Sequence, residues 1–416
     1  METSMPRWSE YTTGERIKIL RGKTIRQSDL AEMTGLSLPT IQGAEQDKRL
    51  TLPTLMKIAA ALRVDTSVIL GQQGPRRAME HGDRTTMRQL SCAVHDSAVG
   101  LLPLGVNAPS ADELRQTTKR CWDLYWKGNY VEAGAVAALL LAEASAHVHA
   151  QPASAQSEAW GFVADAYRLA AYVANLMGSR DLAYAAIGHA QQMADRAGDG
   201  MRAALVASGR SWIYLRDARL EEALALAEKS AVDIEPMFSK ATVDQLVAYG
   251  SHVNFAAVVA SRMGDKERAA DYLSQSHATG ARMGAEHRAY GTVFGPVSAT
   301  TQAVGVNVAL GQTGKALTLI DSIKDVSTLS GAARNRYAMD KAMAQADAKM
   351  FDASLDTLEE ALVAAPDWAR HQALPSVIVQ KVGLANTARL RRVSKLIGAS
   401  PAGTGSFLPA TAKTAL

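Results

Sequence analysis

The sequence is poor in cysteine, with only Cys92 and Cys121 among its 416 residues. Two cysteines cannot form a disulfide framework or a four-ligand zinc site, and such sparse use is typical of a reducing compartment. The chain also has no secretory leader and no apolar run of the length that crosses a membrane. These absences predict a cytoplasmic protein without a metal site, a bound cofactor or a membrane contact.

The motifs of common enzyme classes are also missing. The sequence contains no Gly-x-Ser-x-Gly elbow, no H-E-x-x-H helix and no cluster of Cys and His. Residues 309–316, ALGQTGKA, resemble a phosphate-binding loop, but Ala316 replaces the magnesium-binding hydroxyl and no strand precedes the segment. His147 and His149 project to different faces of a helix, which does not suit a shared metal. We therefore expect no catalytic residues and no enzyme activity.

The small net charge of +4 is unevenly distributed along the chain. Residues 1–70 carry 10 Lys and Arg against 8 Asp and Glu, and residues 71–88 carry 4 against 2. The remainder carries 31 of each sign. All of the excess positive charge therefore lies in the first 88 residues, where it can neutralise a polyanion such as nucleic acid.

The stretch 27–45, QSDLAEMTGLSLPTIQGAE, has the pattern of two short helices joined by a tight turn. Gly35 supplies the positive φ that the turn needs, and Ser37 can cap the second helix. The inward positions, where the two helices must touch, are small or apolar: Leu30, Ala31, Leu36, Ile41 and Ala44. This combination predicts a helix-turn-helix motif, whose second helix enters the DNA major groove.

A longer segment, Arg16 to Val64, resembles the Cro and lambda-repressor class of helix-turn-helix domains, the XRE family. The resemblance is carried by four pieces: IRQSDLA from Ile25, TGLSLPTI from Thr34, AEQDKR from Ala44 and LPTLMKIAAALRV from Leu52. It implies a five-helix bundle over residues 1–70 that binds double-stranded operator DNA. It also implies a homodimer on an inverted repeat, and a transcriptional regulator that is nucleoid-associated when bound.

The resemblance also assigns the contacts with DNA. It implies a phosphate contact for the Gln at the start of the first motif helix and base contacts near the start of the recognition helix. Since Leu38, Pro39 and Gly43 cannot make bidentate bonds to bases, hydrogen-bond readout falls to polar neighbours. Just past the helix, two basic residues suit phosphates. The expected DNA-contact set is Gln27, Ser37, Leu38, Thr40, Gln42, Gln46, Lys48 and Arg49.

Composition suggests where the domains end. Residues 71–88, GQQGPRRAMEHGDRTTMR, have the composition of a linker, so a packed element is not expected before Gln89. The range 71–110 should hold this linker and a connecting helix. The Gly, Pro, Ala and Thr-rich tail, 398–416, is predicted to be disordered.

Between these limits, residues 111–397 are alanine-rich, helical and weakly repetitive. In six segments a turn is followed by a small residue: Ala133, Ala183, Ala223, Ala269, Ala316 and Ala353. Twelve residues before each lie Cys121, Ala171, Ser211, Ala257, Val304 and Lys341, of which the first four are small. Small residues on both sides of a turn let two antiparallel helices approach closely. The predicted fold is all-α, an N-terminal bundle followed by a solenoid of helical hairpins.

The repeat resembles the tetratricopeptide repeat, although the spacings of 37 to 50 residues exceed that family's repeat of about 34. In such a solenoid the first helix of each hairpin lines the concave face. The residues expected there are Trp122, Tyr125, Trp126, Arg168, Tyr172, Asn175, Trp212, Arg216, Asn254 and Arg262. Asn can bond a peptide backbone, Arg a carboxylate, and aromatic rings supply contact area.

The combined architecture resembles bacterial peptide-sensing regulators and actinobacterial regulators with helical repeats. It implies a DNA-binding regulator whose repeat domain binds a signalling ligand, a peptide or a small molecule, that changes DNA binding. The alternative is a repeat domain that only dimerises or holds a protein partner, with the aromatic residues filling gaps between hairpins.

Overall fold

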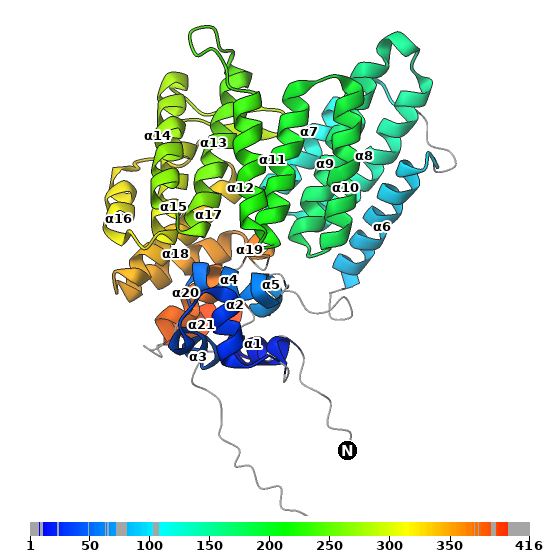
Figure 1. The fold of residues 1–416 in the computed structure, drawn as a ribbon. Helices are drawn as coiled ribbons and strands as arrows, with labels where there is room; N and C mark the ends of the chain where they lie inside the picture. The colour runs from blue at the N-terminus through cyan, green and yellow to red at the C-terminus, as the bar shows by residue number, and fades with distance from the viewer. Residues whose placement is uncertain are drawn as a thin grey trace, which may run out of the picture.

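The protein is represented by a computed structural model, which describes the following residues: 8, 11–22, 25–48, 50–62, 64, 66–71, 81–102, 108–369, 371–372, 374–383 and 388–397. Over these ranges the chain is almost entirely helical, in agreement with the predicted all-α class. The helices of the long C-terminal part stand side by side, and the N-terminal helices lie beneath them (Figure 1).

Five helices make up the N-terminal bundle: α1 (Thr13–Arg21), α2 (Gln27–Thr34), α3 (Leu38–Glu45), α4 (Leu52–Leu62) and α5 (Thr66–Ile69). One apolar side chain from each of four helices is completely buried at the centre: Ile17, Leu30, Ile41 and Leu55. The five-helix bundle predicted for residues 1–70 is therefore present.

Helix α6 (His81–Ala98) follows the bundle and begins earlier than the sequence suggested. Thr86 and Met87 are already buried, so the expectation of no packed element before Gln89 is wrong. Met87, Leu90 and Val94 recur at helical spacing and give α6 an apolar face that packs on α8. Gly134 of α8 allows this approach, because a Cβ there would overlap the Thr86 methyl group. Residues 72–80 of the expected linker lie outside the described residues.

Paired helices build the C-terminal part. They are α7 (Ala111–Lys127), α8 (Tyr130–Ala150), α9 (Gln156–Leu176), α10 (Arg180–Ala197), α11 (Gly200–Arg216), α12 (Leu220–Asp233), α13 (Val243–Met263), α14 (Lys266–Met283), α15 (Pro296–Ala309), α16 (Thr313–Ser322), α17 (Gly331–Asp347) and α18 (Phe351–Ala364). A short 3-10 turn, Ala153–Ala155, precedes α9, and three shorter helices follow α18: α19 (Pro366–Ala369), α20 (Leu374–Val382) and α21 (Ala388–Leu396). Each helix from α7 to α18 packs on its neighbours in the chain, as a solenoid of hairpins requires.

The small residues beside the turns lie where the paired helices touch. In the first five hairpins the predicted pairs, from Cys121 with Ala133 to Val304 with Ala316, are fully buried. In two of them the small side chain also donates across the contact: Cys121 Sγ to the Ala133 carbonyl at 3.3 Å and Ser211 Oγ to the Ala223 carbonyl at 2.5 Å.

In the sixth hairpin the predicted pair, Lys341 with Ala353, is wrong by one residue. The buried pair is Ala342 with Ser354, whose hydroxyl donates to the Ala342 carbonyl at 2.7 Å. The reason lies in the turn, where Lys349 takes the left-handed conformation with φ of 63°. Glycine has this role in most of the other turns, and the small residue follows the left-handed residue at a constant distance.

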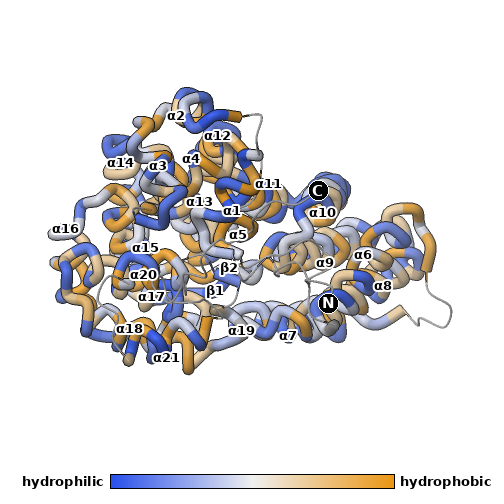
Figure 2. The backbone as a smooth tube through the Cα atoms, turned by 90° about the horizontal axis from the view of Figure 1, so that it is seen from below, coloured by the Kyte–Doolittle hydropathy of each residue, from blue (hydrophilic) through white to orange (hydrophobic). Residues whose placement is uncertain are grey.

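A two-stranded antiparallel hairpin interrupts the helices between α14 and α15. Its strands are β1 (His287–Ala289) and β2 (Thr292–Phe294), with Ala289 opposite Thr292. Seen from below, the hairpin lies in the middle of the molecule, with α7 and α9 on one side and α13 and α15 on the other (Figure 2). No strand was expected from the sequence in this region.

The N-terminal bundle packs directly on the solenoid. Met56 of α4 is buried in the same apolar cluster as Leu215, Leu224 and Val259 of helices α11 to α13. At a second point, Gln380 Nε2 of α20 donates to Thr13 Oγ1 of α1 at 2.5 Å. The bundle and the solenoid therefore share buried apolar surface.

Among the helices of the described residues, α8 is long and apolar enough to cross a membrane by length and composition. This differs from the expectation that the chain lacks such a run. About half of its most apolar stretch, 56%, is buried inside the protein, and its inward side contacts α6, α7 and α9. The apolar residues of α8 therefore belong to a helix of the protein core.

Only one of the two cysteines should react with a thiol reagent in the folded protein. Cys92 is exposed, whereas burial raises the pKa of the Cys121 thiol to about 12, and the thiolate is the reactive form. We expect iodoacetamide at pH 8 to modify Cys92 alone, and both cysteines in guanidinium chloride. Mass spectrometry measures this, and rapid native modification of Cys121 would contradict the packing of α7 on α8.

Replacing Lys349 by Gly should raise the free energy of unfolding by about 1 kcal/mol, because a left-handed backbone costs a residue with a Cβ roughly that much. The matched change is Gly311→Ala in the preceding hairpin, where φ is 69° and an added Cβ meets nothing within 4 Å. It should lower the free energy by a similar amount. Urea denaturation measures both, and changes of the same sign would contradict this account of the turns.

Candidate DNA interface and interior groove

The geometry of α2, the turn and α3 follows from the residues that the sequence analysis identified. Gly35 ends α2 in the left-handed conformation with φ of 62°, and Ser37 Oγ accepts from the Thr40 amide at 3.3 Å. Leu30, Ile41 and Ala44 are buried between the helices. The motif therefore has the predicted turn, cap and interior.

A buried carboxylate fixes the angle between α1, α2 and α3. Glu45, at the end of α3, is only 2% exposed, so it needs partners to remain charged. Arg21 Nε lies 2.6 Å from Glu45 Oε1, and Gln27 Nε2 donates to Glu45 Oε2 at 2.6 Å. Gln27 was expected to contact a phosphate, but in this structure its amide nitrogen is directed to Glu45. Sequence reasoning did not identify the Arg21–Glu45–Gln27 network, because its members are not adjacent in the chain.

The outer face of α3 presents the expected base-reading residues to solvent. Leu38 is 40% exposed, Gln42 is half-buried, and Gln46 and Lys48 are exposed. The Thr40 hydroxyl lies 2.8 Å from Ser37 Oγ, so its hydrogen bonding is partly used within the cap. Helix α3 lies on the lower face of the molecule (Figure 1). Arg49 lies outside the described residues.

In the solenoid, the predicted inward aromatic residues form one continuous cluster. Trp122, Tyr125 and Trp126 of α7 contact one another, and Tyr172 of α9 contacts both Trp122 and Tyr125. Tyr172 also contacts Trp212 of α11, with ring centroids 5.2 Å apart. The inner helices of three successive hairpins thus contribute to one largely buried aromatic wall, and we call these residues the groove.

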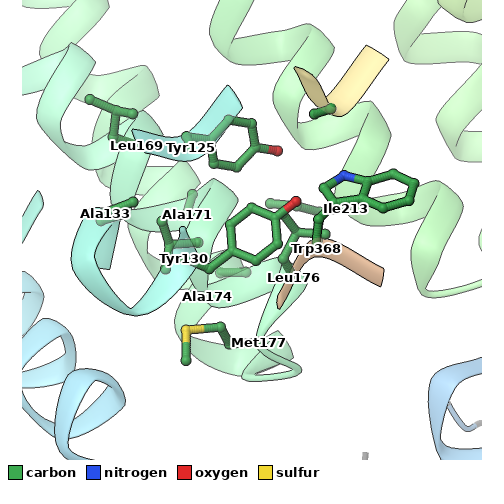
Figure 3. Close-up of a cluster of buried hydrophobic side chains, with 14 of the residues drawn as sticks. Tyr125, Tyr130, Ala133, Leu169, Ala171, Ala174, Leu176, Met177, Ile213 and Trp368 are labelled. Carbon is green, nitrogen blue, oxygen red and sulfur yellow. The ribbon is translucent and has the colours of Figure 1, made fainter. Parts of the chain in front are cut away.

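The sequence did not single out two further rings on this wall, Tyr130 of α8 and Trp368 of α19. Figure 3 shows them in the same buried cluster as Tyr125 and Ile213. Burial raises the pKa of Tyr125 and Tyr130 well above the usual range of phenols, so both rings are neutral. Trp368 lies in a helix after the last hairpin, outside the repeat pattern from which the groove was predicted.

Three of the predicted polar residues also belong to the groove. The Arg168 guanidinium lies over the Trp122 ring, 4.9 Å from its centroid, and the Arg216 guanidinium lies 5.8 Å from the Trp212 centroid. Asn175 is completely buried on α9, one turn beyond Tyr172. Burial lowers the pKa of Arg216, and the neighbouring phenols of Tyr125 and Tyr130 act in the opposite direction.

The last two predicted residues, Asn254 and Arg262 of α13, have partners outside the aromatic cluster. Asn254 Oδ1 accepts from Ser276 Oγ of α14 at 3.1 Å. Burial lowers the pKa of Arg262 to about 10, and repulsion from Arg336 acts in the same direction. Asp340, which accepts from Arg336 Nε at 3.0 Å, offsets part of this shift.

The tip of the β1–β2 hairpin touches the groove. Arg168 Nη2 donates to the Tyr290 carbonyl, and Trp126 Nε1 donates to the Gly291 carbonyl at 2.9 Å. The partners lie 122 and 165 residues apart in the chain, which explains why the repeat pattern gave no sign of this contact. A usable local signal was the segment YGTVF, in which a glycine precedes three strand-forming residues.

Beside the hairpin tip, a cavity of about 370 Å³ opens between α7, α9 and α11. Trp122, Phe162 and Tyr290 provide aromatic walls, and Arg115, Lys119, Arg202 and Arg288 are among the charged lining residues. Asp165 accepts from Arg202 Nε at 3.2 Å. In the described part of the chain, no group of three or more His, Cys, Asp and Glu side chains is arranged to hold a metal ion.

Comparisons with known proteins identify the N-terminal bundle. Residues 17–70 match the family model of the Cro/C1-type HTH DNA-binding domain. No curated protein matches the chain. Among solved structures it is similar to BtubC (BKLC) from P. vanneervenii, with 15% sequence identity and a TM-score of 0.39, over 55% of this chain and 88% of that chain. A TM-score of this size assigns neither a fold nor a function. Because the matched residues are those that form the turn, the cap and the exposed α3, the bundle is a Cro/C1-type helix-turn-helix DNA-binding domain.

Proposed function

We propose that this protein is a transcriptional regulator whose affinity for DNA is changed by a ligand, a peptide or a small molecule, bound in the groove. The DNA-binding domain supports the first half of this proposal. The second half rests on the groove and on its connection to that domain.

The observation that carries the ligand proposal is a pair of side chains with buried polar atoms that have no hydrogen-bond partner. Both amide atoms of Asn175 are buried without a hydrogen bond, and so is Nε of Arg216. Among the described residues, Arg216 forms no ion pair. Buried polar atoms in folded proteins are nearly always hydrogen-bonded, so these atoms are available to a bound ligand.

These two residues also define the chemistry of that ligand. Tyr172 and Trp212 are in ring contact between α9 and α11, and Asn175 and Arg216 each lie about one turn further along these helices. The Asn175 amide can both donate and accept hydrogen bonds, which matches a peptide group, and a guanidinium matches a carboxylate. A peptide or an amino-acid-like molecule with a carboxylate fits this pair.

The groove is linked by packing to the DNA-binding domain. Trp212 packs against the apolar cluster of α11 to α13 that buries Met56 of α4, and Leu52 of the same helix packs there too. A ligand that repositions Trp212 would disturb the surface that holds α4. A ligand shifts an equilibrium between two conformations only if it binds one of them more tightly. We expect the two conformations to differ in how α4 packs on this shared cluster.

We further propose that the regulator binds an inverted repeat as a homodimer, because helix-turn-helix domains of this class read paired half-sites about one helical turn apart. Sedimentation of the purified chain with and without a duplex selected from random sequence measures this stoichiometry. Two chains per duplex are expected, and one chain on a single half-site would contradict the dimer.

The ligand proposal is tested with the operator selected in that way. A low-mass extract of the host culture should change the affinity of the full chain for the operator. Arg216→Met and Asn175→Leu should abolish the change, because each removes a ligand contact while preserving volume. Arg219→Met is the matched control, since Arg219 is exposed and lies over Tyr214 outside the groove.

The outcomes separate the two functions that the sequence left open. If only a macromolecular fraction changes the affinity, the repeat domain is a scaffold for a protein partner. If Arg216→Met, correctly folded, retains the full response to the low-mass extract, the groove is not the ligand site.

The base-reading and phosphate-binding roles on α3 can be separated by two substitutions. Gln42→Ala should relax base preference at one operator position. Binding to the operator with the preferred base should weaken by about 1–3 kcal/mol, and binding to operators with another base there should not change. Lys48→Ala should weaken all sequences alike and reduce the salt dependence of binding by about one counterion. Fluorescence anisotropy on an operator series measures both, and equal, sequence-independent losses would remove Gln42 from base reading.

A further inference from the structure

We infer that the Trp122–Trp126–Arg168 corner of the groove is a binding site for a tight turn of polypeptide, and that the chain's own β1–β2 hairpin occupies it in the unliganded protein. This inference rests on the proposed function, because it names the class of ligand and the step that the ligand must accomplish. A peptide effector would present a similar turn and displace the hairpin.

The corner recognises backbone atoms of the hairpin. Its two hydrogen bonds, from Arg168 and from Trp126, end on the carbonyl oxygens of Tyr290 and Gly291. Carbonyl oxygens are present in any polypeptide, so both interactions are available to another chain that turns in the same way. The indole and guanidinium offer only donors, which matches a turn that presents its carbonyls outward.

The fit also requires a glycine. Gly291 lies against the face of Trp122, and a Cβ at this position would overlap the indole ring. Its φ of 76° follows a φ of 50° at Tyr290, so both central residues of the turn are left-handed. This is the conformation of the two-residue turns that connect strands in hairpins. The corner therefore selects a turn with glycine in second place.

The hairpin is held by apolar burial at its base and by polar contacts at its tip. At the base, Phe294 is buried against Val247 and Ala299, and Glu286 Oε1 accepts from the Val297 amide at 2.8 Å. At the tip, Tyr290 is a bulky residue with positive φ, a conformation that persists only when its surroundings impose it. Loss of the groove contacts would therefore favour release of the tip.

A competing ligand has space in which to begin binding. The cavity of about 370 Å³ beside the tip is walled by Trp122 and by Tyr290 and Gly291 themselves. Along the outer edge, Arg288 of the hairpin pairs with Asp123 of α7 at 2.7 Å, and both side chains are partly exposed. Exposed ion pairs contribute little to stability, so this edge can open readily.

The test compares a glycine substitution that should displace the hairpin tip from the groove with a matched substitution that should not. Gly291→Ala should expel the tip, because the new methyl group overlaps Trp122. Gly284→Ala is the matched control, since Gly284 also has a positive φ, of 71°, but an added Cβ there meets nothing within 4 Å. Amide hydrogen exchange at residues 287–294 should be about tenfold faster or more in Gly291→Ala than in the control, because the two carbonyl bonds are lost.

The vacated corner should then bind the turn from another molecule. The probe is a cyclic peptide with the sequence of residues 285–295, AEHRAYGTVFG. It should raise the melting temperature of Gly291→Ala and quench its tryptophan fluorescence. The wild-type protein should respond much less, and a peptide with alanine in place of glycine should have no effect on either protein.

Two results would overturn the inference. One is equal exchange at the hairpin in Gly291→Ala and the control. The other is a released hairpin without any response to millimolar peptide. If Gly291→Ala does not fold, hydrogen exchange is measured in Trp126→Phe, which removes the indole donor, keeps a ring and should speed exchange at residues 287–294.

Hydrogen exchange and peptide binding are measured without DNA, so their outcome does not depend on whether the protein regulates transcription. Peptide binding without a change in operator affinity would support the peptide site but contradict its role in regulating DNA binding. A response of operator affinity to the low-mass extract, without peptide binding, would keep the ligand proposal and assign the effector to a different chemical class.

Discussion

The solenoid depends on the close approach of two helices beside each turn. At this point the structure places a pair of fully buried small residues, such as Cys121 with Ala133 or Ala171 with Ala183. A larger side chain at either position would separate the helices of a hairpin, and the separation would be passed to the next hairpin through their shared faces. The curvature that brings α7, α9 and α11 to one wall follows from the repetition of this contact.

The arrangement of these helices brings the aromatic residues of the groove into contact. Aromatic residues at helical spacing on α7, α9 and α11 meet across the inner face, as in the contact of Tyr172 with both Trp122 and Trp212. Arginines cover the rings and lie close to the hairpin tip, while Asn175 and Arg216 remain without hydrogen-bond partners at buried atoms. Trp212 also packs against a second apolar cluster, the one that buries Met56 of α4, so this ring joins the wall to the DNA-binding domain.

Most of the helix-turn-helix domain could be predicted from the sequence because its specifying contacts are local. The turn at Gly35, the cap at Ser37 and the inward Leu30 and Ile41 all fall within 27–45. The Arg21–Glu45–Gln27 network was missed because a buried carboxylate at a helix end has no local signature. The role expected for Gln27 at a phosphate stays a prediction, since its amide nitrogen bonds Glu45 in the structure.

In the solenoid the repeat pattern predicted five of the six buried pairs, and the inward aromatic residues do contact one another; their role as a ligand site stays a prediction. It was wrong by one residue in the sixth hairpin because the left-handed residue of that turn, Lys349, lies one position later than the pattern placed it. It could not predict the β1–β2 hairpin, because the contacts that hold its tip join residues far apart in the chain. The packing of α4 on α13 could not be predicted either, because an apolar helix face indicates that it is buried but not which helix covers it.

The central claim is that the DNA-binding domain and the groove wall form one packed unit. The most direct measurement is amide hydrogen exchange over the full chain in the wild-type protein and in Met56→Ala. We expect the substitution to speed exchange in α11 to α13 as well as in α4, because these helices bury Met56 together. Faster exchange confined to α1–α5, with α11 to α13 unchanged, would contradict the claim and reduce the docking to a contact without energetic consequence.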